Sequence, residues 1–415
     1  MNHRRVAVTG LGLVCALGLD RESAWQAMCL GRCGIGELTL FDGAGYRSRM
    51  VAEVPAYDGA AHFSRWERRR YSRADQFAVM AAAEALDDAG LLDSAVSRES
   101  IGVFFGVGTG DLLRSETYYA ELLARGVRRA QPSKVANYLN GGSADPVARR
   151  FGLLGPRACI NSACSSSAMA IGYGAGLIRS GRILAAACGG GDSLCRTALS
   201  GFNALRVVDV DPCRPFDASR NGMTIGEAGA VLILEDMDHA LARRAHVYAE
   251  IAGFAAYCEA HHPTAPEPEG LAVAALIRAA LAASGVSPDA VDHVNAHGTG
   301  TPLNDSSEAL GIRRVFGDRG AEVPVTAIKS MVGHCLGAAG AVEAVTLALT
   351  VDRGVIPPTV HHSRTDAACP ITVVANQGRT WPVGCAVSTS LAFGGNDAAI
   401  VMRRVRQAGG IDAGR

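Results

Sequence analysis

The chain has 415 residues, of which 48% are hydrophobic and 19% charged, and forty basic residues balance forty acidic ones. This length exceeds the size at which one hydrophobic core usually stops growing, so two halves are expected. Balanced charge gives no reason to expect nucleic acid or an anionic membrane as partner. No apolar run reaches the roughly 18 residues of a membrane span. Twelve cysteines without a CxxC pair or zinc-finger spacing favour a reduced, cytoplasmic protein with no metal site.

The chain begins with an apolar stretch that superficially looks like a secretion signal. Two arginines precede residues 6–17, but Gly10, Gly12 and Gly18 interrupt the run and no cleavage site follows. We therefore predict a first strand leading into a glycine turn at residues 6–12. This segment also lacks the third glycine and the later acidic residue of a dinucleotide-binding fingerprint, so it is interpreted as a turn.

An internal repeat organises the next elements. In the first half, an alanine-rich helix at residues 76–89 is followed by a strand at 101–105 that runs into Gly-Thr-Gly. In the second half, a helix at residues 271–284 is followed by a strand at 291–295 that runs into another Gly-Thr-Gly. Such self-similarity indicates two copies of one βα arrangement.

A second correspondence follows each copy. A strand at residues 158–161 enters a turn that holds Cys164, and a helix at 165–178 follows; a strand at 323–328 enters a turn that holds His334, and a helix at 338–349 follows. Strands alternating with helices predict mostly parallel sheets covered by helices, an α/β fold. We place the division near Tyr248, giving halves at residues 1–248 and 249–415.

The predicted helix after Cys164 is unusual because it contains Gly172, Gly174 and Gly176. Each glycine costs about 1 kcal/mol of helix propensity relative to alanine. Ala168 and Ile171 nevertheless keep a helical spacing, so we expect a buried, closely packed helix at the centre of the molecule.

Three short motifs carry the candidate chemistry: Ser-Ala-Cys-Ser-Ser-Ser around Cys164, Asn-Ala-His-Gly-Thr-Gly around His297, and Lys-Ser-Met-Val-Gly-His ending at His334. A cysteine where a strand ends and a helix begins faces the positive end of the helix dipole, which lowers a thiol pKa from about 8.5 toward neutrality. A thiolate is the attacking group that acyl transfer between thioesters requires. The glycines beside both histidines let a substrate approach the backbone.

Together these motifs resemble the Cys-His-His set of the β-ketoacyl-acyl carrier protein synthases, and the resemblance extends over residues 6–405. It implies the thiolase fold, a duplicated five-layer α/β/α/β/α body. It also implies an acyltransferase of the 3-oxoacyl-acyl carrier protein synthase type that needs no cofactor. In this family Cys164 would hold the acyl chain, and His297 and His334 would bind the enolate oxygen left by malonyl decarboxylation.

The resemblance assigns supporting roles to further residues. Lys329, held near the histidine by Glu343, would keep the neighbouring imidazole neutral. The backbone amides of Cys164 and Phe393 would bind the oxygen of the acyl group on the cysteine. The remaining positions form a gate and an acyl pocket: Phe393, Gly394 and Gly395 in the gating loop, and Thr109 and Phe202 in the pocket.

Two loops are expected beside the predicted site. The gating loop departs from the common family pattern at Leu391, where a second phenylalanine is frequent, and at Asp397, where an uncharged residue is frequent. Residues 259–270, which contain three prolines, match the family's other mobile loop. Thr109 stands where a branched apolar residue is common, which hints at an unsaturated or oxygenated chain.

A local basic run is the last candidate. Arginines at 65, 68, 69, 70 and 73 form the densest cluster, and such a run is most often a solvated face. In the family the matching segment docks the acidic acyl carrier protein. The docking residues that we predict are Arg65, Arg68, Arg69, Arg70, Arg128, Arg129 and Arg206. The resemblance also implies a dimer, either with itself or with a related ketosynthase or chain-length-factor subunit.

Two other functions fit these residues less well. A non-catalytic chain-length-factor-like subunit would lack the nucleophile, and Cys164, His297 and His334 argue against it. Thiolases use a second cysteine as base, and synthases primed by coenzyme A have His-Asn where this chain has two histidines. Fatty-acid synthesis and type II polyketide or polyene synthesis both stay open from the sequence.

Overall fold

The computed structural model describes residues 4–110, 112–135 and 142–405. Its main feature is a single mixed sheet with the strand order β13-β11-β10-β15-β16-β9-β1-β8-β6-β4-β5. The strands of this sheet are β1 (Val6–Val14), β4 (Ile101–Gly106), β5 (Arg157–Ile160), β6 (Ala185–Asp192), β8 (Ala228–Asp236), β9 (Ala249–Cys258), β10 (His293–Asn295), β11 (Pro324–Thr326), β13 (Thr372–Val373), β15 (Cys385–Ser390) and β16 (Asn396–Arg403). Short strands form two small sheets: β2 (Gly36–Glu37), β3 (Met50–Ala52) and β7 (Ile225–Gly226), and β12 (Val355–Ile356) with β14 (Arg379–Thr380).

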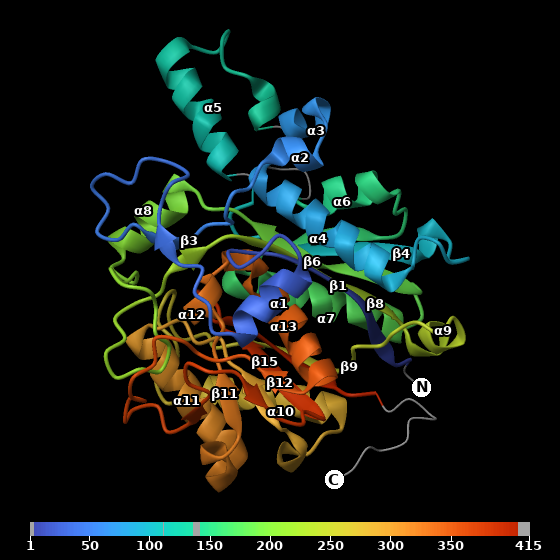
Figure 1. Cartoon of the computed structure of the whole chain (residues 1–415), viewed down its shortest axis with the longest axis vertical. Coiled ribbons are helices and arrows are strands. Elements are labelled where there is room, and N and C mark those ends of the chain that lie inside the picture. The colour runs from blue at the N-terminus through green and yellow to red at the C-terminus, as the bar shows by residue number, and fades with distance from the viewer. Residues whose placement is uncertain (1–3, 111, 136–141, 406–415) are drawn as a thin grey trace.

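Helices cover both faces of this sheet (Figure 1). In the first half they are α1 (Arg21–Cys29), α2 (Gly59–His62), α3 (Arg65–Arg70), α4 (Arg73–Ala89), α5 (Leu112–Arg125), α6 (Ala144–Phe151), α7 (Ser166–Arg179), α8 (Arg196–Ala204) and α9 (Met237–Ala242). In the second half they are α10 (Leu271–Ser284), α11 (Pro302–Phe316), α12 (Lys329–Val332) and α13 (Ala339–Arg353). No helix of the described residues is both long and apolar enough to cross a membrane.

The layers follow from what each helix packs against. Helices α7 and α13 lie together at the centre, α7 against β4 and β6, and α13 against β8 and β15. Helix α4 covers the outer face of β1, β8 and β6, while α10 covers the outer face of β9 and β16, with α11 beside it. The largest apolar core lies around α7 and α13, between the two halves of the sheet. The two halves of this continuous sheet form two separate layers. The order of layers is therefore helix, sheet, helix, sheet, helix, as predicted.

The sheet is less parallel than the repeat predicted. Ladders at both ends are parallel, such as β4 with β5 and β6, and β10 with β11 and β15, but β1, β8, β9 and β16 pair antiparallel with their neighbours. Strands β15 and β16, for example, are joined by the five residues 391–395, and so short a connection permits only antiparallel pairing. Strands β1 and β9 also join the two halves, through Ala7 opposite Glu250 and Val8 opposite Ala249. The predicted division between residues 248 and 249 stays a prediction.

The expected glycine turn near the N-terminus is wrong. Gly10 and Gly12 lie inside β1, which continues to Val14. A Cβ at Gly12 would stand 1.9 Å from the carbonyl oxygen of Ala81, and one at Gly10 would stand 2.1 Å from that of Ala85. The glycines therefore let α4 lie directly on the strand.

The central helix is buried on one side only. A Cβ at Gly172 would meet the ring of Phe254, and one at Gly174 would meet the sulfur of Cys188, so both positions are tightly packed as expected. Gly176 has open space beside it, and Tyr173 is 50% exposed. The helix thus has an outer face that the sequence did not predict.

Candidate active site

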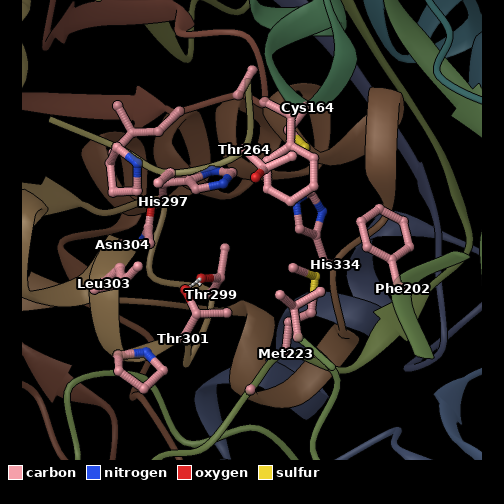
Figure 2. Close-up of a pocket in the computed structure, with 18 of the residues that line it drawn as sticks. Cys164, Phe202, Met223, Thr264, His297, Thr299, Thr301, Leu303, Asn304 and His334 are labelled. Atoms are coloured by element: carbon pink, nitrogen blue, oxygen red, sulfur yellow. Dashed lines mark hydrogen bonds between the residues drawn. The ribbon is translucent and has the colours of Figure 1, made fainter. Parts of the chain in front are cut away.

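Cys164 lies in a sharp turn between a strand and the central helix. Strand β5 ends at Ile160, a single 3₁₀ turn spans Ala163–Ser165, and α7 starts at Ser166. Ala163 has a φ of +52°, a conformation that residues with a side chain rarely adopt. Such strain is kept where the turn must aim a particular side chain, and Figure 2 shows Cys164 at the edge of a cavity.

The thiol differs from the sequence expectation in its acidity. Burial raises the pKa of Cys164 to about 11, although the positive charge of Lys329 and the backbone N–H of Phe393 both lower it. The expectation of a pKa near neutrality considered the helix end alone and omitted the loss of water around the sulfur. The thiol is thus mostly protonated near neutral pH.

The structure brings Cys164, His297 and His334 together. Their ligand atoms all lie within 4.8 Å of one another, and the two imidazole rings stand at 83° with centroids 5.2 Å apart. Both histidines are almost fully buried, and Figure 2 shows their rings beside the sulfur. These three residues are also the one group in the described part of the chain with the donor spacing of a metal site. A cysteine and two histidines are borderline-soft donors of the kind that suit zinc.

Hydrogen bonds fix which nitrogen of each imidazole carries the proton. The ammonium of Lys329 donates to His297 Nδ1 at 3.2 Å, to the His297 carbonyl at 2.7 Å and to the carboxylate of Glu343. An ammonium has three hydrogens, so all three are used. His334 Nδ1 accepts the backbone N–H of Leu336 at 3.1 Å. Both rings therefore carry their proton on Nε2, the nitrogen left free to donate.

The electrostatics keep both rings neutral. Burial and then the charge of Lys329 hold the pKa of His297 and of His334 well below the ordinary 6.5. Burial raises the pKa of Glu343 to about 7, opposed by Lys329. Lys329 contacts His297 directly, although its position in the sequence, five residues before His334, pointed to the other ring.

Two buried carboxylates that the sequence analysis missed hold the His297 turn. Glu308 accepts the backbone N–H of His297 at 2.7 Å and of Gly298 at 2.8 Å, and the hydroxyl of Thr389 at 2.6 Å. Asp305 accepts the backbone N–H of Thr299 at 3.1 Å and of Gly300 at 3.2 Å. Acids in the first turns of a helix such as α11 look ordinary in a sequence. The available signal was the i, i+3, i+7 spacing of Asp305, Glu308 and buried Ile312, which places all three on one face of the helix.

A third missed carboxylate joins the two halves. Buried Asp192 accepts backbone N–H groups from Gly108, Thr109, Gly110 and Gly337 at 2.6–2.8 Å. Four amide donors satisfy a carboxylate away from water and fix both loops against each other. The Thr109 hydroxyl also bonds to Asp192, at 3.1 Å, and Thr109 is not among the residues that line the cavity. Its acyl-pocket role stays a prediction.

The predicted gate closes one side of the cavity. Phe393 and Phe202 both line it, with ring centroids 6.0 Å apart. Gly394 and Gly395 have φ values of +85° and +69°, which glycine adopts without strain. The cavity measures about 200 Å³, below the roughly 300–1,000 Å³ of typical ligand pockets. The cavity is therefore small for a long acyl chain.

The predicted docking arginines are all exposed: Arg65, Arg68, Arg69 and Arg70 on α3, Arg128 and Arg129 after α5, and Arg206 after α8. Arg114 of α5 donates to the backbone carbonyls of Arg69 and Arg70, which ties α5 to α3. Arg206 also lines the cavity. Arg73 differs from the rest of the run because it pairs with buried Glu227 at 2.6 Å.

A partly buried thiol beside two neutral imidazole N–H donors defines a site for thioester chemistry, in which negative charge develops on a carbonyl oxygen. Comparison with known proteins agrees. Residues 3–240 match the family model for the β-ketoacyl synthase N-terminal domain, and residues 248–363 match the C-terminal domain. The chain belongs to the β-ketoacyl synthase family and has its thiolase fold.

Individual relatives span nearly the whole chain. A 3-oxoacyl-[acyl-carrier-protein] synthase 2 from Synechocystis sp. is 35% identical and covers 97% of this chain and 99% of the relative. A protein of the same name from Coxiella burnetii is 34% identical, covering 98% and 100%. Among solved structures, the ishigamide ketosynthase/chain length factor has a TM-score of 0.92 at 34% identity, covering 97% and 100%. A type II polyketide ketosynthase in complex with its acyl carrier protein has a TM-score of 0.90 at 30% identity, with the same coverage.

Proposed function

We propose that this protein is a β-ketoacyl-acyl carrier protein synthase, which condenses an acyl group held on Cys164 with malonyl-acyl carrier protein in fatty-acid or type II polyketide biosynthesis. The observation that carries the proposal is the pair of neutral imidazoles whose Nε2 protons are free beside the thiol. Donors fixed in advance toward a developing oxyanion are worth about 2.7–4 kcal/mol each in comparable sites.

The first half-reaction transfers the acyl group. The Cys164 sulfur, on losing its proton, attacks the carbonyl carbon of the acyl thioester, the carbon–sulfur bond to the carrier breaks, and the carrier leaves as its thiol. The charge of Lys329 favours the thiolate. The backbone amides of Cys164 and Phe393 bind the oxyanion of the tetrahedral intermediate.

The second half-reaction forms the new bond. The malonyl carboxylate leaves as CO₂, and its electron pair forms an enolate whose oxygen accepts hydrogen bonds from His297 and His334. The enolate carbon attacks the acyl carbonyl on Cys164, and the cysteine leaves as thiolate. Lys329 and Glu343 act as positioning residues that keep His297 in the donating tautomer.

A non-catalytic chain-length-factor-like subunit is the competing function, and the complete Cys-His-His set speaks against it. Incubating the protein with acyl- and malonyl-loaded carrier proteins and detecting β-ketoacyl product by mass spectrometry tests the proposal. A panel of fatty-acid and polyketide carrier proteins in the same assay assigns the pathway. Failure to condense any of these pairs, with Cys164 intact, would favour the competing function.

We further propose an acyl carrier protein and a second ketosynthase-type subunit as partners. One compared structure is a ketosynthase with its acyl carrier protein, and another is a ketosynthase with its chain length factor. Strand β5 is the edge of the main sheet and is partly exposed, and beside it lies a groove formed by α7 and Phe254. An exposed sheet edge readily pairs with another chain. We also propose that the protein is cytoplasmic, because all twelve of its free thiols would stay reduced there.

The exposed arginines are predicted to govern docking of the carrier protein. Changing Arg69 and Arg70 to glutamate should raise KM for the acyl carrier protein, and the wild-type interaction should weaken with salt as exposed charges are screened. An exposed ion pair contributes only about 0.2–1 kcal/mol to binding, so both arginines must be changed to give a measurable effect. Reaction with a small thioester that carries no protein should change little.

Arg244→Glu provides the matched control, because Arg244 is exposed and follows α9, which Figure 1 places well away from α3. It should leave KM for the carrier protein unchanged. Equal losses toward carrier-bound and small thioesters in the double variant would assign the cluster to the fold and end the docking interpretation.

A further inference from the structure

The thiol and the two imidazoles of the candidate active site have the composition of a zinc site. The donor atoms of Cys164, His297 and His334 all lie within 4.8 Å of one another. Tetrahedral zinc, with Zn–S about 2.3 Å and Zn–N about 2.0–2.1 Å, needs such donors about 3.3–3.6 Å apart, so side-chain movements of about 1 Å would close the set. All three residues line one cavity, which leaves room for the water that completes a zinc site with three protein ligands. Distance alone therefore does not keep zinc out.

The position of the protons on the two imidazoles opposes the metal. Nδ1 of each ring already accepts a hydrogen bond, so a metal beside the sulfur would have to bind Nε2. A neutral histidine binds a metal through a nitrogen lone pair, and its single ring proton must then lie on the other nitrogen. In metal sites that other N–H donates to a carboxylate, a backbone carbonyl or water. Zinc at Nε2 would therefore require an acceptor beside each Nδ1.

Both Nδ1 atoms face donors instead. The ammonium of Lys329 lies 3.2 Å from Nδ1 of His297, and the backbone nitrogen of Leu336 lies 3.1 Å from Nδ1 of His334. Neither an ammonium nor a backbone N–H can accept a hydrogen bond. A proton moved to either Nδ1 would point at another N–H hydrogen, although both rings are almost fully buried. A buried donor without an acceptor is costly, and each ring would bear that cost.

The ammonium of Lys329 is also fixed in place. Lys329 is 2% exposed, and its remaining hydrogens go to the His297 carbonyl at 2.7 Å and to the carboxylate of Glu343. Glu343 is 1% exposed, and its other oxygen accepts the hydroxyl of Ser390 at 3.3 Å. The ion pair is thus held from both sides, and its positive end faces the place that a divalent cation would take.

We propose that Lys329 excludes zinc from the Cys-His-His set, because its ammonium donates to the nitrogen of His297 on which a zinc-bound imidazole must carry its own proton. The backbone N–H of Leu336 has the same effect on His334. The exclusion stands on these hydrogen bonds alone. Only its use, which is to keep the thiol and both N–H donors free for condensation, rests on the proposed function. Lys329 is a positioning residue in both roles, since the bond that presents Nε2–H to an oxyanion also closes that nitrogen to a metal.

A pair of substitutions that removes this donor should create a zinc site. Lys329→Met with Glu343→Gln takes away the ammonium and leaves no buried charge unpaired. Nδ1 of His297 can then carry the proton, and the full-length protein should bind Zn²⁺ at least tenfold more tightly than wild type, since the group bonded to a ligand histidine changes metal affinity about 10–100-fold. Competition with a fluorescent zinc chelator measures Kd. The visible absorption of added Co²⁺ shows whether the ligands are tetrahedral and include sulfur.

Three further variants locate the gain. Adding Cys164→Ala to the pair should remove it, which separates this site from the other free thiols. Glu343→Gln alone keeps the ammonium and should bind Zn²⁺ no more tightly than wild type. Lys134→Met, which removes the ammonium of the ion pair with Glu121, is the matched control and should also equal wild type. Lys329→Ala with Glu343→Gln serves if the first pair folds poorly, because the space it leaves admits a water that accepts from Nδ1.

Equal Kd values for Zn²⁺ in wild type and the paired variant would overturn the proposal. So would a gain that survives Cys164→Ala, or one that appears in full with Glu343→Gln alone. Zinc affinity is measured without acyl substrates, so failure of the wild type to condense acyl and malonyl carrier proteins would instead overturn only the proposed function.

Discussion

Changing Cys164 to alanine should abolish both acylation and condensation. The described structure brings no other thiol to the two imidazoles, and the sulfur is the group that carries the acyl chain between half-reactions. Intact-protein mass spectrometry after incubation with an acyl carrier protein thioester should show the acyl mass on the wild type and none on the variant. Cys258→Ala, which removes an exposed thiol, should remain acylated.

Cys164→Gln should separate the two half-reactions. Its side-chain amide imitates the carbonyl of an acylated sulfur, so the variant should decarboxylate malonyl thioester without accepting an acyl group. Acylation of Cys164→Ala at the wild-type rate would show that the nucleophile lies elsewhere.

Changing His297 or His334 to alanine should slow decarboxylation and condensation by a factor on the order of 10²–10³ for each lost donor. Acyl-Cys164 should still form at least in part, because these rings act chiefly on the enolate. Release of CO₂ from labelled malonyl-carrier protein and the acyl mass on the enzyme measure the two steps separately. His246→Ala, which removes a half-buried histidine paired with Asp352 outside the cavity, is the control.

Normal condensation in both histidine variants would exclude the enolate role. The reason for each tautomer also differs, since Lys329 holds His297 while a backbone amide holds His334. Loss of Lys329 should therefore disturb the tautomer of His297 more than that of His334.

Much of this site could be predicted because its signals are local. The turns around Cys164, His297 and His334 are short motifs at strand ends, and the helix at Leu271–Ser284 has the bounds that its composition predicts. The five-layer arrangement was predicted from the resemblance to the β-ketoacyl synthases. What the sequence could not give was pairing over long distances, such as β1 with β9 across the two halves. Antiparallel and parallel neighbours look alike in an apolar strand that is buried on both faces.

The buried carboxylates of Glu308 and Asp192 could not be predicted for a different reason. Glu308 and Asp192 act mainly by accepting backbone N–H groups from loops, and backbone donors leave no trace in residue identity. The acidity of Cys164 also depends on burial, which a strand-to-helix position does not reveal.

The duplicated turns finally explain why the molecule has a single reaction centre. The 3₁₀ turns before α7 and α13 both open on a residue with positive φ, Ala163 at +52° and Leu336 at +50°, so Gly337 is the counterpart of Cys164. A Cβ at Gly337 would stand 2.2 Å from the backbone nitrogen of Gly108. No side chain can occupy the second turn without displacing the first half's loop. One turn thus presents the reactive sulfur, and the equivalent turn packs against the loop of the first half instead.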